Sequence, residues 1–213
     1  MQYFKNKDFV ISLITGVVLL VVSFVVSVYA VDYANQSISN SVTDIVLSNT
    51  RVYNVDGIFV YGAVLMVACI ALVCIVRPQR MPFIFKSIAL FTFIRSCFIS
   101  LTHIAPYPAH IAISSSIFTT LFPTIFTGDD LFFSGHVGLS FLMALILWEY
   151  RFWRILFLAS SVIFGIVVLL GHLHYSIDVA SAFFITFTIF TIAKNIFKQD
   201  WSIMKAPAQT TSV

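Results

Sequence analysis

Long, continuously apolar runs dominate the chain, and shorter polar connections separate them. The runs do not alternate between apolar and polar residues, so they predict helices rather than the strands of a membrane barrel. A helix needs about 20 apolar residues to cross the hydrocarbon core of a bilayer. Six runs approach or exceed this length: Phe9–Val31, Gly57–Val76, Pro82–Leu101, Phe132–Trp148, Ile155–Gly171 and Ile177–Phe197. We therefore expect an all-α, polytopic membrane protein, built as a bundle of six transmembrane helices.

Composition strengthens the membrane assignment. The 213 residues are 60% hydrophobic and only 10% charged, with a mean hydropathy of +0.99. Soluble domains carry roughly 25% charged residues, so this chain cannot cover a soluble globule with polar surface. Its length suits a single membrane domain over residues 1–213 and excludes a soluble module beside it. Cys69, Cys74 and Cys97 lie inside apolar runs and do not form the pattern of a disulfide framework.

The charged residues are distributed unevenly between the two ends of the predicted helices. With six spans, ten of the 12 basic residues share one side: Lys5, Lys7, Arg77, Arg80, Lys86, Arg151, Arg154, Lys194, Lys198 and Lys205. The positive-inside rule then predicts that both termini are cytoplasmic. The opposite side receives all five histidines and most aspartates: His103, His110, His136, His172, His174, Asp32, Asp44, Asp56, Asp129, Asp130 and Asp178. Reactive side chains are therefore expected on the extracytoplasmic or lumenal face.

Three segments outside the apolar runs carry further expectations. The first run is too long for the core of a signal peptide, so we interpret it as an uncleaved span. The two long outer connections, 32–56 and 102–131, are typical of lids or binding loops. Residues 205–213 are expected to form a disordered tail.

Two polar groups at the ends of apolar runs are the candidates for chemistry. His174 and Asp178 are four residues apart, so on a helix the carboxylate can hold Nδ1 of the histidine and leave Nε2 as a nucleophile or base. A structural pair that caps the helix is the alternative. Ser134 and Gly135 precede His136 at the start of another run, where a hydroxyl and free backbone N–H groups form an anion site. A histidine there can protonate a leaving oxygen.

Together these segments resemble the active-site motifs of the sphingomyelin synthase family, a branch of the type 2 phosphatidic acid phosphatase superfamily. The first segment is Asp130-Leu131-Phe132-Phe133-Ser134-Gly135-His136, and the second is His172-Leu173-His174-Tyr175-Ser176-Ile177-Asp178. A third family block resembles Phe93-Ile94-Arg95 through Thr102 and Pro106-Tyr107-Pro108. The resemblance covers the expected catalytic core, about residues 83–197.

The resemblance implies a membrane lipid enzyme that moves a phosphocholine- or phosphoethanolamine-type headgroup from a glycerophospholipid donor to ceramide or another lipid alcohol. His174, oriented by Asp178, would form a phospho-histidine, and His136 would act as acid and then as base. Arg95, Asp130, Ser134, Gly135 and Tyr175 would bind substrate, with no metal, cofactor or nucleic acid. The sequence leaves the oligomeric state open.

Two alternatives remain. A lipid phosphate phosphatase of the same superfamily would use the same histidines with water as acceptor. That branch, however, carries an arginine six residues before its nucleophile, where this chain has Val168. A non-enzymatic membrane carrier would bind a metal or proton through the same ionisable groups. Carriers usually place such groups at mid-span within repeated halves, whereas here they lie at helix ends and no repeat is visible.

Overall fold

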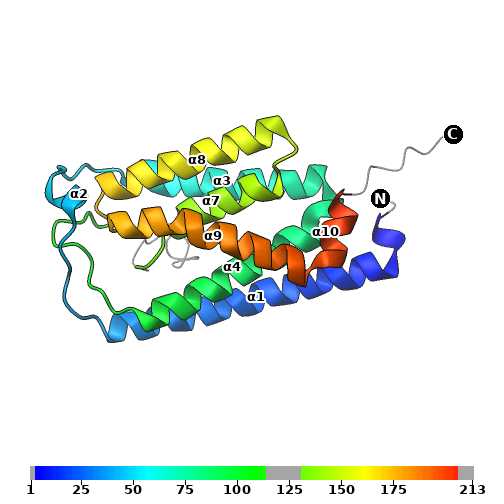
Figure 1. Cartoon of the computed structure of the whole chain (residues 1–213), viewed down its shortest axis with the longest axis horizontal. Coiled ribbons are helices and arrows are strands. Elements are labelled where there is room, and N and C mark those ends of the chain that lie inside the picture. Colours follow the sequence, from blue (N-terminus) through cyan, green and yellow to red (C-terminus); the bar gives the residue numbers. More distant parts are fainter. Residues whose placement is uncertain (1–2, 114–130, 206–213) are drawn as a thin grey trace.

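The computed structural model describes residues 3–113 and 131–205. All regular structure in these two ranges is helical. The elements are η1 (Tyr3–Lys5), α1 (Lys7–Gln36), α2 (Ile45–Ser48), α3 (Asp56–Val76), η2 (Pro78–Arg80), α4 (Met81–Leu101), α7 (Gly135–Ile146), α8 (Arg151–Leu170), α9 (Ser176–Ile196) and α10 (Lys198–Lys205). The long helices run along one axis as a bundle (Figure 1). The all-α prediction is confirmed for the described residues.

Within the described ranges, five helices are long and apolar enough to cross a bilayer: α1, α3, α4 together with η2, α8 and α9. The run Phe132–Trp148, expected to be a further span, contains only the 12-residue helix α7. A helix of this length extends about 18 Å, well short of the roughly 30 Å hydrocarbon core. Nine of its residues are buried, so its apolar side chains pack mainly in the protein interior and not against lipid. The six-span topology and the cytoplasmic termini stay predictions.

Helix α7 lies in the middle of the bundle, between α8, α9 and α4 (Figure 1). Gly138 permits this close packing. A β-carbon there would lie 2.7 Å from two ring carbons of Phe91 and 2.8 Å from Oγ1 of Thr186. On the opposite face, the buried hydroxyl of Ser161 donates to the carbonyl of Val137 at 2.8 Å. The segment that precedes α7 is thus attached to a helix that packs closely against α4, α8 and α9.

Helix α1 packs extensively against α4 through small side chains. Gly16, Ser23 and Ala30 are buried and seven residues apart, which places them on nearly one face of the helix. A β-carbon at Gly16 would lie 3.3 Å from Cβ of Phe85, so the two helices approach closely at this point. Small residues at such contacts are typical of helix packing in membranes.

A buried polar cluster ties together the end of the bundle at which α1 begins and α10 ends (Figure 1). Nζ of Lys86 lies 2.6 Å from Oδ2 of Asp200 and 2.7 Å from Oγ of Ser12, so α4, α10 and α1 meet in one network. Ser12 also donates to Asp200. Nearby, Arg80 pairs with Glu149 at 3.2 Å. These basic residues share one end, as the charge pattern predicted.

The predicted disordered tail, 205–213, lies outside the described residues except for Lys205. That residue ends α10 and forms an ion pair with Glu149.

Removal of the Asp200 carboxylate should destabilise the fold. In Asp200→Ala the buried Lys86 ammonium would lose its countercharge, and breaking a buried ion pair costs about 3–5 kcal/mol. Glu149→Gln is the comparison variant. The side chain of Glu149 is 47% exposed, and its buried partner Arg80 keeps hydrogen bonds to the Ile146 carbonyl and the Tyr150 hydroxyl. Thermal unfolding in detergent should show a large loss for the first variant and little for the second. Equal melting temperatures would contradict this assignment.

Candidate active site

His174 and Asp178 form a buried pair where α9 begins. Nδ1 of His174 lies 3.3 Å from Oδ2 of Asp178, and the two residues are 1% and 2% exposed. The same carboxylate oxygen accepts the backbone N–H of Tyr175 at 3.1 Å, which completes a capping box at the helix N-terminus. One carboxylate therefore starts the helix and orients the imidazole. The geometry is compatible with both interpretations of the pair, as a helix cap and as an oriented histidine.

The segment before α7 is joined directly to this pair. The backbone N–H of Ser134 donates to the carbonyl of Asp178 at 3.1 Å. The two polar segments, separated by about 38 residues in the sequence, are thus adjacent in the fold. Ser134 is fully buried, and its hydroxyl has no hydrogen-bond partner among the described residues. It precedes the first N–H groups of α7, which a helix N-terminus leaves available for an anion.

Arg95 reaches the start of α7 from α4. Its Nε donates to the carbonyl of Phe133 at 3.0 Å, and the residue is 6% exposed. A β-carbon at Gly135 would lie only 3.2 Å from Cζ and Nε of Arg95. The guanidinium therefore lies against the first residue of α7, next to the positive end of the helix dipole. A cation and a helix N-terminus at one position favour an anionic group beside them.

His136 occupies an aromatic environment in the first turn of α7. Its ring centroid is 4.5 Å from that of Phe59 in α3 and 5.2 Å from that of Phe164 in α8. The residue is 8% exposed and lines a cavity together with Arg95 and Gly135. His136 is therefore placed on the same wall as the predicted phosphate-binding residues.

Both polar segments contain a residue in a left-handed backbone conformation. Phe132 has φ 95° and His172 has φ 55°, values that are uncommon for residues other than glycine. Such conformations cost of order 1–3 kcal/mol and cluster at functional sites. Each precedes a candidate catalytic histidine by a few residues. Neither position is a glycine, so the sequence did not indicate a left-handed conformation at either one.

Tyr175 is a positioning residue by its contacts. Its hydroxyl donates to the carbonyl of Ala105 at 2.8 Å and accepts the N–H of Val42 at 3.3 Å. The side chain is 2% exposed and ties both outer connections to the start of α9. The expectation that Tyr175 binds substrate is not supported by these contacts, because its hydroxyl already holds two partners within the protein.

Asp44 has a structural part in this site that the sequence analysis did not identify. Its Oδ1 accepts the N–H groups of Val46 and Leu47, and its Oδ2 accepts that of Ser176 at 2.7 Å. Burial raises the pKa of this carboxyl, but the backbone donors outweigh burial and hold the pKa below its usual value. An aspartate before a short apolar run is a recognisable helix cap. Its contact with Ser176 is visible only in the fold.

His172 packs beside the site rather than into the catalytic pair. Its ring lies edge-on to Tyr107 at 5.2 Å between centroids. Burial lowers its pKa, against the opposing effects of Thr50 and Asp44, and this favours a neutral ring.

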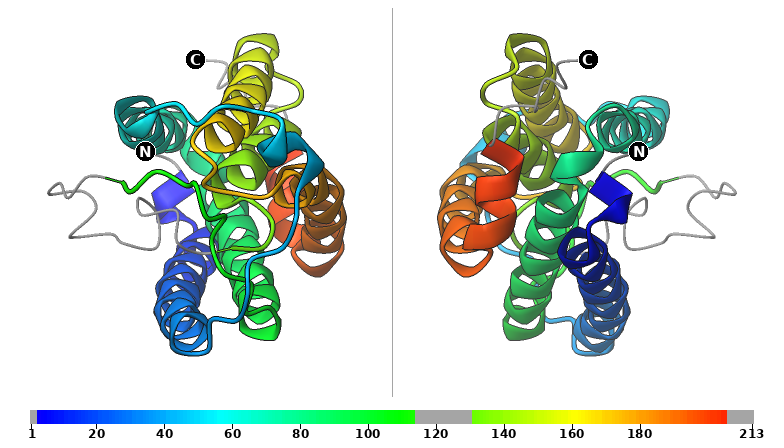
Figure 2. Two further views of the ribbon diagram at one scale, coloured as in Figure 1. Left: turned by 90° about the vertical axis from the view of Figure 1, so that its left-hand side faces the viewer. Right: turned by 90° about the vertical axis from the view of Figure 1, so that its right-hand side faces the viewer.

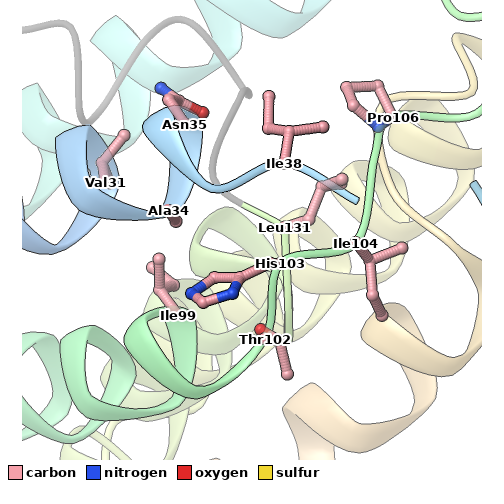
Figure 3. Close-up of a pocket in the computed structure, with 10 residues that line it drawn as sticks. All are labelled: Val31, Ala34, Asn35, Ile38, Ile99, Thr102, His103, Ile104, Pro106 and Leu131. Atoms are coloured by element: carbon pink, nitrogen blue, oxygen red, sulfur yellow. The ribbon is translucent and has the colours of Figure 1, made fainter. Parts of the chain in front are cut away.

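The outer connections cover the segment that leads into α7. Leu131 packs with Leu47 and Tyr175 in a small apolar cluster. Figure 3 shows Leu131 and His103 in a separate small pocket at the ends of α1 and α4. His103 lies edge-on to Tyr33 there and belongs to the covering layer. Asp130, predicted to bind substrate, lies outside the described residues.

A comparison with protein-family models finds a match that includes both polar segments of this site. A family model described as PAP2 superfamily C-terminal matches residues 127–195, about a third of the chain, and spans both polar segments. Searches of curated proteins and of solved structures find no match. The family match together with the apolar helices identifies an integral membrane protein. It supports membership of the chain in the type 2 phosphatidic acid phosphatase superfamily, whose members are phosphatase and phosphotransferase enzymes.

Proposed function

We propose that this protein transfers a phospho-headgroup between membrane lipids, from a glycerophospholipid to ceramide or a similar lipid alcohol. One observation carries the proposal. The buried His174–Asp178 pair is joined by a backbone hydrogen bond to the segment that bears Ser134 and His136. This contact supports the assignment of His174 as nucleophile, Asp178 as its orienting group and His136 as the second histidine, with the anion site beside them.

In the first half-reaction, Nε2 of His174 attacks the phosphorus of the donor, and a P–N bond forms. The P–O bond to the diacylglycerol oxygen breaks, and His136 gives its proton to that oxygen. Asp178 holds Nδ1 of His174, so the lone pair of Nε2 is available and the charge that develops on the ring is stabilised. The product is a phospho-histidine that carries the headgroup.

In the second half-reaction, the acceptor hydroxyl gives its proton to His136, and its oxygen attacks the phosphorus. The P–N bond breaks and returns neutral His174. His136 thereby exchanges the roles of acid and base between the two steps. Water in place of the lipid alcohol would give a hydrolase with the same residues.

The anion site suits a singly charged phosphodiester. Arg95, the Ser134 hydroxyl and the first N–H groups of α7 provide one full charge and several dipoles. Val168 occupies the α8 position at which the phosphatase branch carries arginine, and it is fully buried. This apolar side chain provides no positive charge to balance the second negative charge of a phosphomonoester.

The overall test is a transfer assay with purified protein. Labelled phosphatidylcholine or phosphatidylethanolamine is supplied with and without ceramide, and the lipids are analysed by mass spectrometry. We expect a ceramide phospho-headgroup product that depends on ceramide. Release of water-soluble headgroup phosphate alone would favour the hydrolase, and no turnover of any lipid would contradict the enzyme proposal.

The catalytic assignment predicts a hierarchy of losses. His174→Ala should abolish turnover, and His136→Ala should block departure of the diacylglycerol oxygen. Asp178→Asn should cost roughly 10²- to 10⁴-fold in kcat, because the tautomer of His174 would no longer be controlled. His172→Ala is the control and should retain activity. Rapid quench in alkaline detergent should detect phospho-enzyme in the wild type but not in His174→Ala, because the P–N bond of phospho-histidine survives alkali but not acid. Substantial activity in that variant would rule out the mechanism.

Alanine substitutions at Ser134 and Ser161 should distinguish a loss of activity from a loss of stability. The buried Ser134 hydroxyl has no partner in the described protein, so Ser134→Ala should leave the melting temperature unchanged or raise it while lowering kcat/KM about tenfold. Ser161 is equally buried but bonded to Val137, so Ser161→Ala should lose about 1 kcal/mol of stability and keep its activity per folded molecule. A loss of stability without loss of activity in Ser134→Ala would make that serine structural.

The donor class can be tested by competition between substrates. We expect a higher kcat/KM for phosphatidylethanolamine or phosphatidylcholine than for phosphatidic acid. Arg95→Ala should lower activity on the diester at least about tenfold, since a hydrogen bond to a charged group contributes roughly 1.5–3 kcal/mol. A clear preference for phosphatidic acid would instead indicate the phosphatase branch.

A further inference from the structure

A large cavity lies between α1, α3, α4 and α7. Its volume is about 290 Å³, and it is partly open to the surroundings. Its walls are almost entirely apolar and include Leu20 in α1, Val67 and Ile70 in α3, and Phe85 in α4. A space of this size at membrane depth, with no polar lining over most of its length, suits a hydrocarbon chain.

One end of this cavity is different in character. Arg95, Gly135 and His136 line it there. The buried guanidinium of Arg95 and the N-terminus of α7 favour an anion, while the remaining walls favour hydrocarbon. The complementary ligand is an amphiphile with an anionic head and an apolar chain. A free phosphate would leave the apolar part unfilled, and a neutral hydrocarbon would make no use of the polar end.

The length of the cavity matches one leaflet of a bilayer. Phe85 and Arg95 are ten residues apart on α4, which corresponds to about 15 Å along the helix axis. This is half of the roughly 30 Å hydrocarbon core. A chain whose headgroup lies at Arg95 would therefore reach toward the level of Phe85 without leaving its own leaflet.

Helices α1 and α3 both line the cavity but have few contacts with each other. The extensive contacts of α1 are with α4, whereas α3 contacts α7, α8 and η2. Figure 2 shows α1 and α3 as separate rods on the same side of the bundle. Val67 lines the cavity and is 41% exposed, so the α3 wall is accessible from the lipid side.

We propose that this cavity binds one acyl chain of the phospholipid donor, which enters sideways from the bilayer between α1 and α3. The cavity then selects donors by chain length, because a chain longer than its depth leaves methylene groups without contacts. This inference rests on the proposed function and deepens it, since it identifies the acyl chain as the part of the donor by which the enzyme selects its substrate. Val67 and Phe85 become specificity residues rather than catalytic ones.

Photo-crosslinking of the full chain tests the proposal without turnover. The probe is a phosphatidylethanolamine with a diazirine on its acyl chain, incorporated into nanodiscs with wild type, Val67→Trp or Leu72→Trp. Leu72 is the matched control, because it is 48% exposed on the same helix and does not line this cavity. A tryptophan at position 67 should fill the cavity and lower labelling of α1 and α3 about tenfold, equivalent to about 1.4 kcal/mol. Leu72→Trp should label like the wild type.

The chain-length profile supplies the second readout. Val67→Phe, a smaller change, should shift preference toward donors with shorter acyl chains in competition labelling, whether or not Val67→Trp folds. Unchanged labelling and preference in the Val67 variants would overturn the proposal. So would labelling confined to residues 156–167, because it would place the chain in the apolar groove between α3 and α8. Since labelling requires no chemistry, an enzyme that turns over no lipid would leave this result readable.

Discussion

The Asp178 residue connects the parts on which the rest of the site depends. Its carboxylate caps α9 through Tyr175 and holds His174, while its backbone carbonyl accepts the N–H of Ser134. A buried carboxylate is costly unless hydrogen bonds compensate it, so each of these partners also stabilises Asp178. Helix start, histidine orientation and the junction with α7 are therefore coupled. Displacement of one would disturb the other two.

A second layer of contacts holds this junction from outside the bundle. Asp44 joins the first outer connection to the N–H of Ser176, and Tyr175 joins both connections through its hydroxyl. Ile111 donates its N–H to the carbonyl of Gly171 at 3.0 Å, so the turn before α9 is fastened on a further side. These contacts position catalytic groups on a short turn that would otherwise have only local restraints. They also explain how strained conformations at Phe132 and His172 persist.

Packing in the membrane region is tight on one side and open on the other. Small residues let α1 lie close to α4, and Gly138 lets α4 and α9 lie close to α7. Between α1 and α3 the walls stay apart and leave the apolar cavity that ends at Arg95. A rigid frame beside an open flank fits the proposed function, in which the substrate is a component of the bilayer. The buried cluster of Lys86, Asp200 and Ser12 closes the far end of the frame.

The sequence by itself determined the helical class and the long apolar segments, and it indicated the His174–Asp178 pair. The first two follow from hydrophobic run length. The four-residue spacing predicted the pair on one helical face, whereas His174 lies just before α9 and Asp178 reaches it from the first turn of that helix. The motifs also indicated Ser134, Gly135 and His136. Only the tertiary structure showed that α7 is short and buried. It also showed that the Tyr175 hydroxyl is hydrogen-bonded to both outer connections and that Asp44 accepts a hydrogen bond from the first residue of α9. It also placed Arg95 against Gly135. Each of these depends on contacts between residues tens of positions apart, which no local pattern encodes, because burial and close approach arise from how whole helices pack.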